Sequence, residues 1–527
     1  MRRLLVVVLL LSLASPAIAL PPPCNAGQVW EDTNGNGRRD PDEKPLPNIK
    51  VSDGVAVVLT DANGEYRLPL IDGRTVFVIK PAGYDLPERR DGLPDFWTQV
   101  QSRPGPPLKY GGIPAASPMC RNFGLLPQEA SGQDDFDVLL FADTQTKNRA
   151  DVGYYRRDII EPLIGKHNAQ LGLTLGDIVD DDLSLYPALN AQTKRLQVPW
   201  LHIAGNHDLD FDAPRDEDSL SSFRNIYGPD TFAWEEARAV LIGLDNVIYR
   251  PGQKPAYIGG FRDDQFAFLE AYLPTVPKDR LLVVGMHIPL FEATGGVETF
   301  RRPDRERLFA VLRDFPHVLV LSGHSHTQRH WYHDASTGWQ GERPLHEYNV
   351  GAACGAFWSG VKDKEGVPDA TMADGTPNGY ARLRVSNGGV YALSWHPARS
   401  PDSAIGLHAP KVLRQGAYPA WGVYANVYMG DDSTRVEYRI DDGDWKPMTK
   451  VLQADPALVV ENMRDDLAET LRGYDRSPEA KPSPHLWRGS LPTQLEAGEH
   501  RVEVRAQDRW RGELRAATSY KLQSATE

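Results

Sequence analysis

Residues 198–208, VPWLHIAGNHD, hold the motif that decides how this chain folds. An apolar run as long as a buried β-strand, Val198–Ala204, leads directly into Gly205-Asn206-His207-Asp208. The glycine allows a tight turn, and the three residues after it offer an amide oxygen, an imidazole and a carboxylate. Polar side chains at the end of an apolar strand are typical of an open α/β sheet, which binds its ligands at the carboxyl ends of the strands.

Four other apolar runs in the central part of the chain end in the same way. The polar residues that follow them are Asp143 and Gln145 after 136–142, Asp177 after 171–175, His287 after 281–286, and His324 and His326 after 318–322. Helical patterns such as Asp263–Leu273 and Arg305–Phe315 alternate with these runs, which indicates an α/β fold. Because parallel strand ends meet at one edge of a sheet, we expect these side chains to converge on a site for borderline divalent ions.

The order Asp-x-Gln, Gly-Asp, Gly-Asn-His-Asp, His and Gly-His-x-His resembles that of the calcineurin-like metallophosphoesterase superfamily, over about residues 135–395. The resemblance implies two β-sheets flanked by helices, with a site for two divalent metal ions at the sheet edge. It assigns one ion to Asp143, Gln145, Asp177 and His326, and the other to Asp177, Asn206, His287 and His324. The ions would be Mn, Fe, Zn or Mg, and Gln145, which stands where the family usually has histidine, would weaken the first site.

The resemblance also implies the reaction, which is hydrolysis of a phosphate ester by a hydroxide held between the two ions. His207 would stabilise charge on the phosphoryl group or protonate the leaving oxygen, and Asp208 would hydrogen-bond to His207 and fix its tautomer. Trp358, Asn378 and Tyr380 are candidates for the substrate side of the cleft, although packing within the loops explains them equally well. Monoesters and diesters are both compatible with such a site.

A function of a different class is a surface or periplasmic binding protein whose phosphoesterase domain is vestigial. The complete set of ligand and acid–base residues disfavours that alternative, so the expected partner is a small or envelope-derived phosphate ester. The net charge of −13 and the pI of about 5.6 leave no basic surplus, which argues against nucleic acid as the main partner. The oligomeric state is left open by the sequence.

Short β-type runs separated by turn residues flank the central part on both sides. They predict a β-sandwich over residues 20–130, a phosphoesterase domain over 131–397 and a second β-sandwich over 398–527. Residues 81–127, rich in proline and glycine, are expected to form a long extended connector within the first of these domains. This layout resembles the exported bacterial branch of the superfamily, with an N-terminal B-type or transthyretin-like domain and a C-terminal β-sandwich.

The twelve residues from Asp32 to Glu43 match an EF-hand loop, although the runs that flank them are strands rather than helices. Ligand-type side chains stand at Asp32, Asn34, Asn36, Asp40 and Glu43. The segment resembles the calcium-stabilised B-type and transthyretin-like repeats of bacterial surface proteins, which implies a structural Ca²⁺. The alternative is a solvated acidic turn.

Residues 1–19 have the features of a secretory signal peptide. A positive Arg2-Arg3 precedes the apolar run Leu4–Leu13, and Ala17-Ile18-Ala19 has the spacing of a cleavage site. The protein is therefore expected to be exported, to the periplasm or outside the cell, with no transmembrane segment after cleavage of the signal.

Export makes a disulfide between Cys24 and Cys120 possible, because oxidising compartments permit such bonds. It would close the first β domain, and two unpaired thiols are the alternative. The third cysteine, Cys354, lies in an apolar run typical of a buried strand end.

Overall fold

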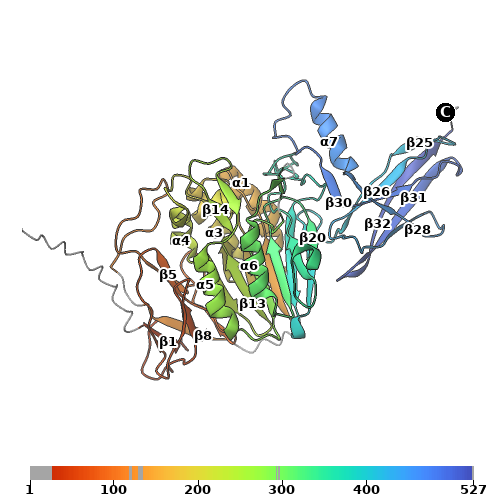
Figure 1. Cartoon of the computed structure of the whole chain (residues 1–527). Helices are drawn as coiled ribbons and strands as arrows, with labels where there is room; N and C mark the ends of the chain where they lie inside the picture. Colours follow the sequence, from red (N-terminus) through yellow and green to blue (C-terminus); the bar gives the residue numbers. More distant parts are fainter. Residues whose placement is uncertain (1–26, 118–120, 129–134, 292, 295–296, 525–527) are drawn as a thin grey trace, which may run out of the picture.

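The computed structural model describes residues 27–117, 121–128, 135–291, 293–294 and 297–524. Figure 1 shows a β-rich N-terminal part, a central α/β part and a C-terminal part made of long strands. The α/β fold with β-rich regions at both ends is thereby confirmed. The predicted signal peptide, Cys24 and Cys120 lie outside the described residues, and the boundaries at residues 130 and 397 stay predictions.

A five-stranded sheet carries the first three site motifs. Its order is β11-β10-β9-β22-β23, made of β11 (Trp200–Ile203), β10 (Leu171–Leu175), β9 (Phe136–Phe141), β22 (Gly379–Val385) and β23 (Tyr391–Pro397). The first three strands are parallel and buried along their whole length, as expected for a sheet covered on both faces. β22 extends the sheet by pairing antiparallel with β9.

A six-stranded sheet carries the two histidine motifs. Its order is β12-β13-β16-β19-β21-β20, made of β12 (Thr231–Glu235), β13 (Ala239–Leu244), β16 (Leu281–Gly285), β19 (Val318–Ser322), β21 (Leu345–Asn349) and β20 (Arg329–His333). The two sheets pack face to face, since a Cβ added to Gly285 of β16 would come within 2.6 Å of Ile203 of β11. Two small hairpins, β14 (Val247–Tyr249) with β15 (Tyr257–Gly259) and β17 (Ala293–Thr294) with β18 (Val297–Glu298), belong to the loops of this part.

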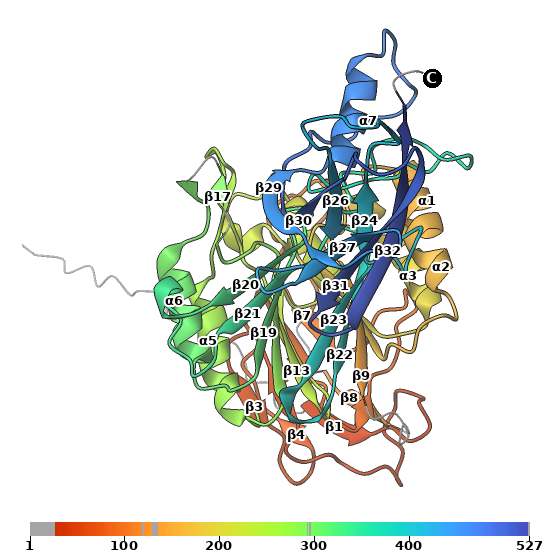
Figure 2. The same cartoon turned by 90° about the vertical axis from the view of Figure 1, so that its right-hand side faces the viewer.

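Helices cover the outer sides of the two central sheets (Figure 2). Beside the five-stranded sheet lie α1 (Arg149–Tyr155), α2 (Glu161–Leu163) and α3 (Tyr186–Thr193), and beside the six-stranded sheet lie α5 (Asp263–Tyr272) and α6 (Arg302–Leu312). A further short helix, α4 (Ser221–Tyr227), follows the Gly-Asn-His-Asp motif. α6 begins before the predicted Arg305 because Pro303 favours the first turn of a helix. Among the described helices, none combines the length and the apolar character that crossing a membrane requires.

The N-terminal part contains two four-stranded sheets. Their orders are β4-β1-β8-β6 and β3-β2-β5-β7, with β1 (Gly27–Glu31), β2 (Lys50–Ser52), β3 (Val57–Leu59), β4 (Glu65–Tyr66), β5 (Arg74–Val78), β6 (Tyr84–Asp85), β7 (Trp97–Val100) and β8 (Phe123–Pro127). The expectation of one long connector over 81–127 is wrong, because β6, β7 and β8 lie within it and β8 pairs with β1. Phe77 of β5 packs against Phe268 of α5, so this part shares an apolar core with the central part.

The C-terminal part is a pair of sheets with an apolar cluster of its own. Their orders are β24-β26-β30-β29 and β25-β32-β31-β27-β28, with β24 (Ile405–His408), β25 (Val412–Arg414), β26 (Gly422–Val427), β27 (Val436–Ile440), β28 (Lys446–Pro447), β29 (Thr449–Ala454), β30 (Pro482–Ser490), β31 (Gly498–Asp508) and β32 (Gly512–Gln523). An additional helix, α7 (Pro456–Asp466), stands between β29 and β30 and projects from this part in Figure 1.

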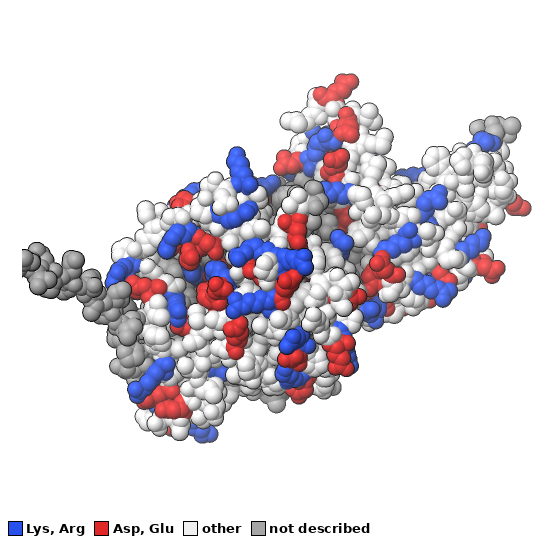
Figure 3. Space-filling view, in the orientation of Figure 1, with Lys and Arg blue, Asp and Glu red and all other residues white. Residues whose placement is uncertain are grey.

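Charged side chains of both signs are interspersed over the face of the molecule seen in Figure 3. Ion pairs are frequent among the described residues, and Arg307, for example, pairs with Asp263 at 3.0 Å and with Glu270 at 2.9 Å. The surplus of acidic residues in the sequence is therefore not gathered into one acidic area on this face.

His202 of β11 is a buried histidine of the core. Its ring lies 4.2 Å from that of Tyr227, and neither of its ring nitrogens has a hydrogen-bond partner. Burial lowers the pKa of His202 to about 3, because the charged imidazolium would lose its hydration without compensation.

Replacing His202 by phenylalanine should make stability less sensitive to acid. Because the folded-state pKa of about 3 lies below the ordinary 6.5, the unfolded chain takes up the proton first, and stability falls as the pH drops below 6.5. His202 should thereby cost the native protein about 2 kcal/mol between pH 7 and pH 5. Denaturant titrations at both pH values should show a loss smaller by that amount in His202→Phe. Equal losses in the two proteins would contradict this assignment.

Candidate metal centre

All seven predicted metal ligands lie directly after the carboxyl ends of β9, β10, β11, β16 and β19. Five of the seven have a backbone φ in the left-handed region, between 34° and 71°; these are Asp143, Gln145, Asp177, His324 and His326. Residues other than glycine adopt this conformation at a cost, and such strain is common at functional sites. The chain therefore turns sharply after these strands. The surrounding structure has to stabilise the strained backbone at these turns.

One half of the centre is formed by Asp177, His287 and His324. Ligand atoms of these three residues all lie within 4.8 Å of one another. His287 donates its Nδ1–H to the Leu175 carbonyl at 2.8 Å, which leaves its Nε2 facing Asp177 Oδ2 at 3.2 Å. Asn206 Oδ1 lies 3.1 Å from the same Nε2. The four residues predicted to share the second ion are thus brought together.

The other half of the centre is formed by Asp143, Gln145 and His326. The Nδ1 atom of His326 lies 2.6 Å from the Gly355 carbonyl, and its Nε2 faces Asp143 Oδ1 at 3.5 Å. Gln145 donates its backbone N–H to the Asp177 carbonyl at 2.9 Å, and its side-chain oxygen lies 3.7 Å from the Cys354 thiol. Backbone carbonyls therefore hold one nitrogen of both His326 and His287, the arrangement that orients histidine metal ligands.

The charges of the centre depend on one another because its carboxylates are buried. Burial raises the pKa of Asp177, but the charges of His287, His207 and His324 outweigh that effect and hold it below its ordinary value. Burial lowers the pKa of His287, and the carboxylates of Asp177 and Asp143 more than compensate, so that it rises to about 9. Buried carboxylates, imidazoles and amide oxygens within a few ångströms of each other fit divalent cations of the Mn, Fe and Zn type.

His207 lies beside the centre but is held by other carboxylates than predicted. Its backbone N–H donates to Asp177 Oδ1 at 2.8 Å, and its ring Nδ1 lies 2.7 Å from Asp181 Oδ1 and 3.2 Å from Asp180 Oδ1. The prediction that Asp208 fixes the tautomer of His207 is therefore wrong. The run Asp180-Asp181-Asp182 directly after the Gly-Asp motif was the signal in the sequence for this contact.

Asp208 instead stabilises the loops that follow the strand ends. Its carboxylate accepts hydrogen bonds from the backbone of Gly205 at 2.8 Å and of Ile178 at 3.2 Å, and from the Tyr186 hydroxyl at 3.0 Å. Burial, with the nearby charge of Asp177, raises the pKa of Asp208 to about 7. The side chain thus points into the protein, where it contacts the backbones of the two loops that carry predicted metal ligands.

The three candidates for the substrate side of the cleft are packing residues. Trp358 is buried and donates its indole N–H to the Thr144 carbonyl at 3.0 Å. Asn378 is buried and donates to Asp158 Oδ2 at 2.9 Å. Tyr380 stacks on His396, with ring centres 5.1 Å apart. These contacts favour packing within the loops, the alternative interpretation, over a role in lining the substrate cleft.

The aromatic side chain at the mouth of the centre is Phe357, one residue before the predicted tryptophan. It is 42% exposed and stacks on His326, with ring centres 4.6 Å apart. The sequence gives no sign of which of these two neighbouring aromatic residues faces outward, because both have φ values near +55° that depend on the loop around them.

The N-terminal part reaches this region through Lys109 and Tyr110. The Tyr110 hydroxyl donates to the backbone carbonyl of Asp181 at 2.9 Å, and the Lys109 backbone donates to Asp212 at 2.7 Å. Asp181 is the residue that contacts His207, so the segment predicted as a mere connector braces the loop beside the centre.

The EF-hand-like loop brings its five predicted ligand residues together between β1 and β2. Asp32 accepts from the backbones of Asn36 at 3.1 Å and Gly37 at 2.8 Å. Asp40 accepts from the side chains of Asn34 and Asn36 at 2.7 and 2.8 Å. The carboxylate of Glu43 accepts from the backbones of Thr33 at 2.9 Å and Asp40 at 3.0 Å. The loop thus curls around its own acidic side chains, as an EF-hand loop does.

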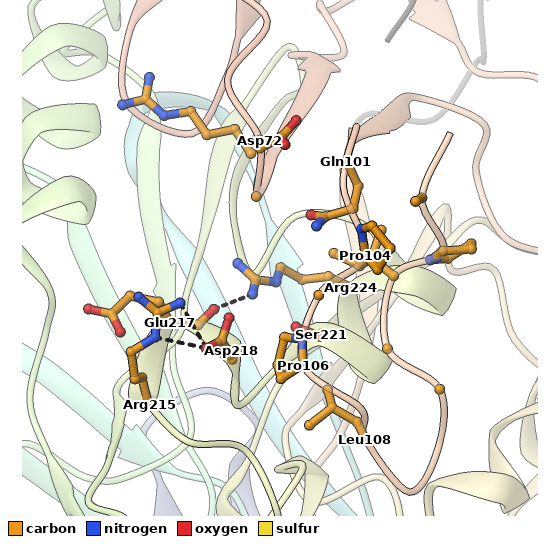
Figure 4. A pocket seen from close by; sticks show the side chains of 18 of the residues that line it. Asp72, Gln101, Pro104, Pro106, Leu108, Arg215, Glu217, Asp218, Ser221 and Arg224 are labelled. Atoms are coloured by element: carbon orange, nitrogen blue, oxygen red, sulfur yellow. Dashed lines mark hydrogen bonds and ion pairs between the residues drawn. The ribbon is translucent and has the colours of Figure 1, made fainter. Parts of the chain in front are cut away.

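A separate cavity of about 660 Å³ lies between the N-terminal and central parts and contains none of the predicted ligands (Figure 4). The proline-rich stretch 104–108 forms one wall, and Arg215, Glu217 and Arg224 stand on another. Arg215 pairs with Asp218 at 2.9 Å, and Arg224 points toward Glu217, to whose carbonyl it donates. The cavity therefore lies apart from the strand ends that carry the predicted ligands.

Three family models match the chain in succession. The N-terminal model of calcineurin-like phosphoesterase matches residues 33–107, the calcineurin-like phosphoesterase model matches 136–328, and the C-terminal model matches 347–513. A curated relative, the serine-aspartate repeat-containing protein F of Staphylococcus epidermidis, is 34% identical over 82 residues, which are 14% of this chain. The chain spans 5% of the length of that relative.

Solved structures with a similar arrangement are distant in sequence. A dimetal phosphatase from Danio rerio is 17% identical, with a TM-score of 0.32, over 49% of this chain and 98% of the other. A purple acid phosphatase from seeds of yellow lupin (Lupinus luteus) is 12% identical, with a TM-score of 0.38, over 67% of each chain.

Replacing Trp358 by phenylalanine should destabilise the protein. The change leaves the buried Thr144 carbonyl without its indole donor, which should cost about 2 kcal/mol of the free energy of unfolding. Chemical denaturation measures this loss, with Phe357→Leu as the control because Phe357 is exposed. Equal stability of Trp358→Phe and the wild-type protein would contradict the packing role.

Proposed function

The chain belongs to the calcineurin-like phosphoesterase family, and on that premise we propose that it is an exported hydrolase that cleaves a phosphate ester at a two-metal centre. Family membership itself identifies a metal-dependent phosphoesterase. The observation that carries the finer proposal is the convergence of Asp177, His287 and His324, with Asp143 and His326 beside them. Such a set offers enough buried ligands for two ions that share Asp177.

In this proposal Asp143, Gln145, Asp177 and His326 hold one divalent ion, and Asp177, Asn206, His287 and His324 hold the other. When bound, the ions would supply an activated water as nucleophile and would neutralise charge on the phosphoryl oxygens. The metal identity, which the donor set narrows to Mn, Fe, Zn or Mg, is part of the proposal.

His207 is the residue proposed to handle the proton of the leaving group. Asp181 holds its Nδ1, so its Nε2 is the ring nitrogen available to a substrate. Burial lowers the pKa of His207, but the hydrogen bond to Asp181 and the charge of Asp177 raise it to about 9. With Nδ1 held by Asp181, a proton on Nε2 can be donated to the leaving oxygen or can stabilise negative charge on the phosphoryl group. Asp208 acts indirectly, by holding the loops that carry Asp177 and His207.

Export to the periplasm or the cell exterior belongs to the same proposal and rests on the composition of residues 1–19. The substrate would then be a small or envelope-derived phosphate ester of that compartment. The competing proposal, a binding protein with a vestigial phosphoesterase domain, would need no strained backbone at five ligand positions. The retention of that strain favours the enzyme.

A structural Ca²⁺ in the loop Asp32–Glu43 is a second proposal. Its support is the arrangement of the carboxylates of Asp32, Asp40 and Glu43 around one curled loop between two strands. The ion would join β1 to β2 and stiffen the N-terminal part, as calcium does in extracellular modules.

Replacing Asp177 by asparagine should abolish hydrolysis. Full-length protein would be stripped of metal, reloaded with Mn and tested on p-nitrophenyl phosphate and on bis-p-nitrophenyl phosphate. We expect kcat/KM on the better substrate to fall more than about 100-fold, because changes in residues that only support metal ligands already cost 10–100-fold. The matched control is Asp182→Asn, which alters a carboxylate that caps Ser184 nearby. Undiminished activity in Asp177→Asn would contradict the two-metal proposal.

Replacing Glu43 by glutamine should weaken the response of the protein to calcium. Added Ca²⁺ should raise the melting temperature of the chelator-treated full-length protein, with Mn held constant, because a ligand stabilises the state that binds it. The rise should shrink in Glu43→Gln and persist in Asp42→Asn, which alters an exposed acid of the same loop. If Ca²⁺ leaves the wild-type melting temperature unchanged, the loop is a solvated acidic turn.

A further inference from the structure

Phe357 is held in an unusual position at the mouth of the metal centre. Its φ of 57° lies in the left-handed region, and its ring is 42% exposed while it stacks on the metal-ligand candidate His326. A residue other than glycine stays in this region of φ only where the surrounding structure holds it, and such strain is common at functional sites. Its position is therefore better explained by contact with something that approaches the centre from outside.

Lys147 lies against the same ring. Its ammonium group is 5.4 Å from the centre of the Phe357 ring, close enough for a cation–π contact. The residue is exposed, and within the described part of the chain its ammonium makes no ion pair. Lys147 follows Gln145 by two residues, so its backbone lies close to one of the predicted ligand positions.

The acids nearest to Lys147 are already hydrogen-bonded by other groups. Asp151 accepts the backbone N–H of Lys147 at 3.0 Å, and Asp180 lies 3.2 Å from the Nδ1 atom of His207. Asp181 contacts the same nitrogen. The ammonium of Lys147 makes no ion pair with these acids, although its charge opposes the rise that burial gives to the pKa of Asp151 and Asp180. It lies beside the centre at which the proposed function places an anionic phosphate.

We propose that Lys147 and Phe357 form a substrate subsite beside the first-ion position, and that the subsite binds a second anionic group of the phosphate ester. This inference rests on the proposed function and adds the substrate class to it. The scissile phosphate would occupy the centre itself. A carboxylate or a second phosphate on the alcohol part of the substrate would reach Lys147, which is separated from His326 by the ring of Phe357. Phe357 would support the carbon skeleton between the two groups.

Binding of uncleavable phosphonates tests the subsite separately from catalysis. The probes are benzylphosphonate and the three carboxybenzylphosphonates, titrated calorimetrically into the Mn-loaded full-length protein. At least one carboxylated probe should bind the wild-type protein about tenfold more tightly than benzylphosphonate, as a charge-assisted hydrogen bond would give. Lys147→Met should remove this advantage and leave the affinity for benzylphosphonate unchanged.

The matched control is Lys278→Met. Lys278 also lies over an aromatic ring, with its ammonium 4.4 Å from the centre of the Phe315 ring. Lys278 precedes β16 and Phe315 precedes β19, so both lie at the opposite ends of these strands from the predicted ligands. This variant should keep the advantage of the carboxylated probe. Such a result would show that the cation at position 147, and not the loss of any lysine–aromatic pair, carries the effect.

The proposal is overturned if no carboxylated probe binds better than benzylphosphonate, if the advantage survives in Lys147→Met, or if none of the probes binds. Hydrolysis of p-nitrophenyl phosphate by the same wild-type protein, and its loss in Asp177→Asn, reports on the proposed function independently. A protein that hydrolyses the ester without preferring a second charge would keep the proposed function and lose the subsite.

Discussion

Two buried carboxylates, Asp143 and Asp177, impose the constraint on which the rest of the centre depends. Charges of one sign are stable inside a protein only when opposite charges and hydrogen bonds surround them. Asp177 meets the backbone N–H of His207 and the ring of His287, and Asp143 meets the backbone of His324 and the ring of His326. Strand order, tight turns and histidine positions all serve to bring these partners to one sheet edge.

The same constraint explains why the metal-binding loops are strained. Five of the seven proposed ligand positions have a positive φ, so the chain turns sharply after the strands that precede them. Asp208 stabilises the turns by accepting hydrogen bonds from the backbones of both neighbouring loops. From outside, Tyr110 adds a contact of the N-terminal part to the loop of Asp181, so the flanking part supports the site and does not merely adjoin it.

The central fold, and the placement of the seven proposed ligands at the strand ends, could be predicted from the sequence because each motif is local: an apolar run is followed at once by a polar residue of a ligand type. Contacts between segments that are distant in the sequence could not be predicted in this way. Whether His207 meets Asp208 or Asp181 depends on how two loops pack, and whether Trp358 or Phe357 faces outward depends on a strained turn. The strands β6, β7 and β8 were hidden because they are short and lie among segments rich in proline and glycine, while pairing with β1 and β5 is decided by tertiary structure.

Anomalous X-ray diffraction from crystals of the Mn-loaded protein tests the central claim most directly. The account predicts two manganese peaks at the strand ends. One should be bounded by Asp143, Gln145 and His326 and the other by Asn206, His287 and His324, with Asp177 between the two. A single peak, or peaks away from these residues, would contradict the account.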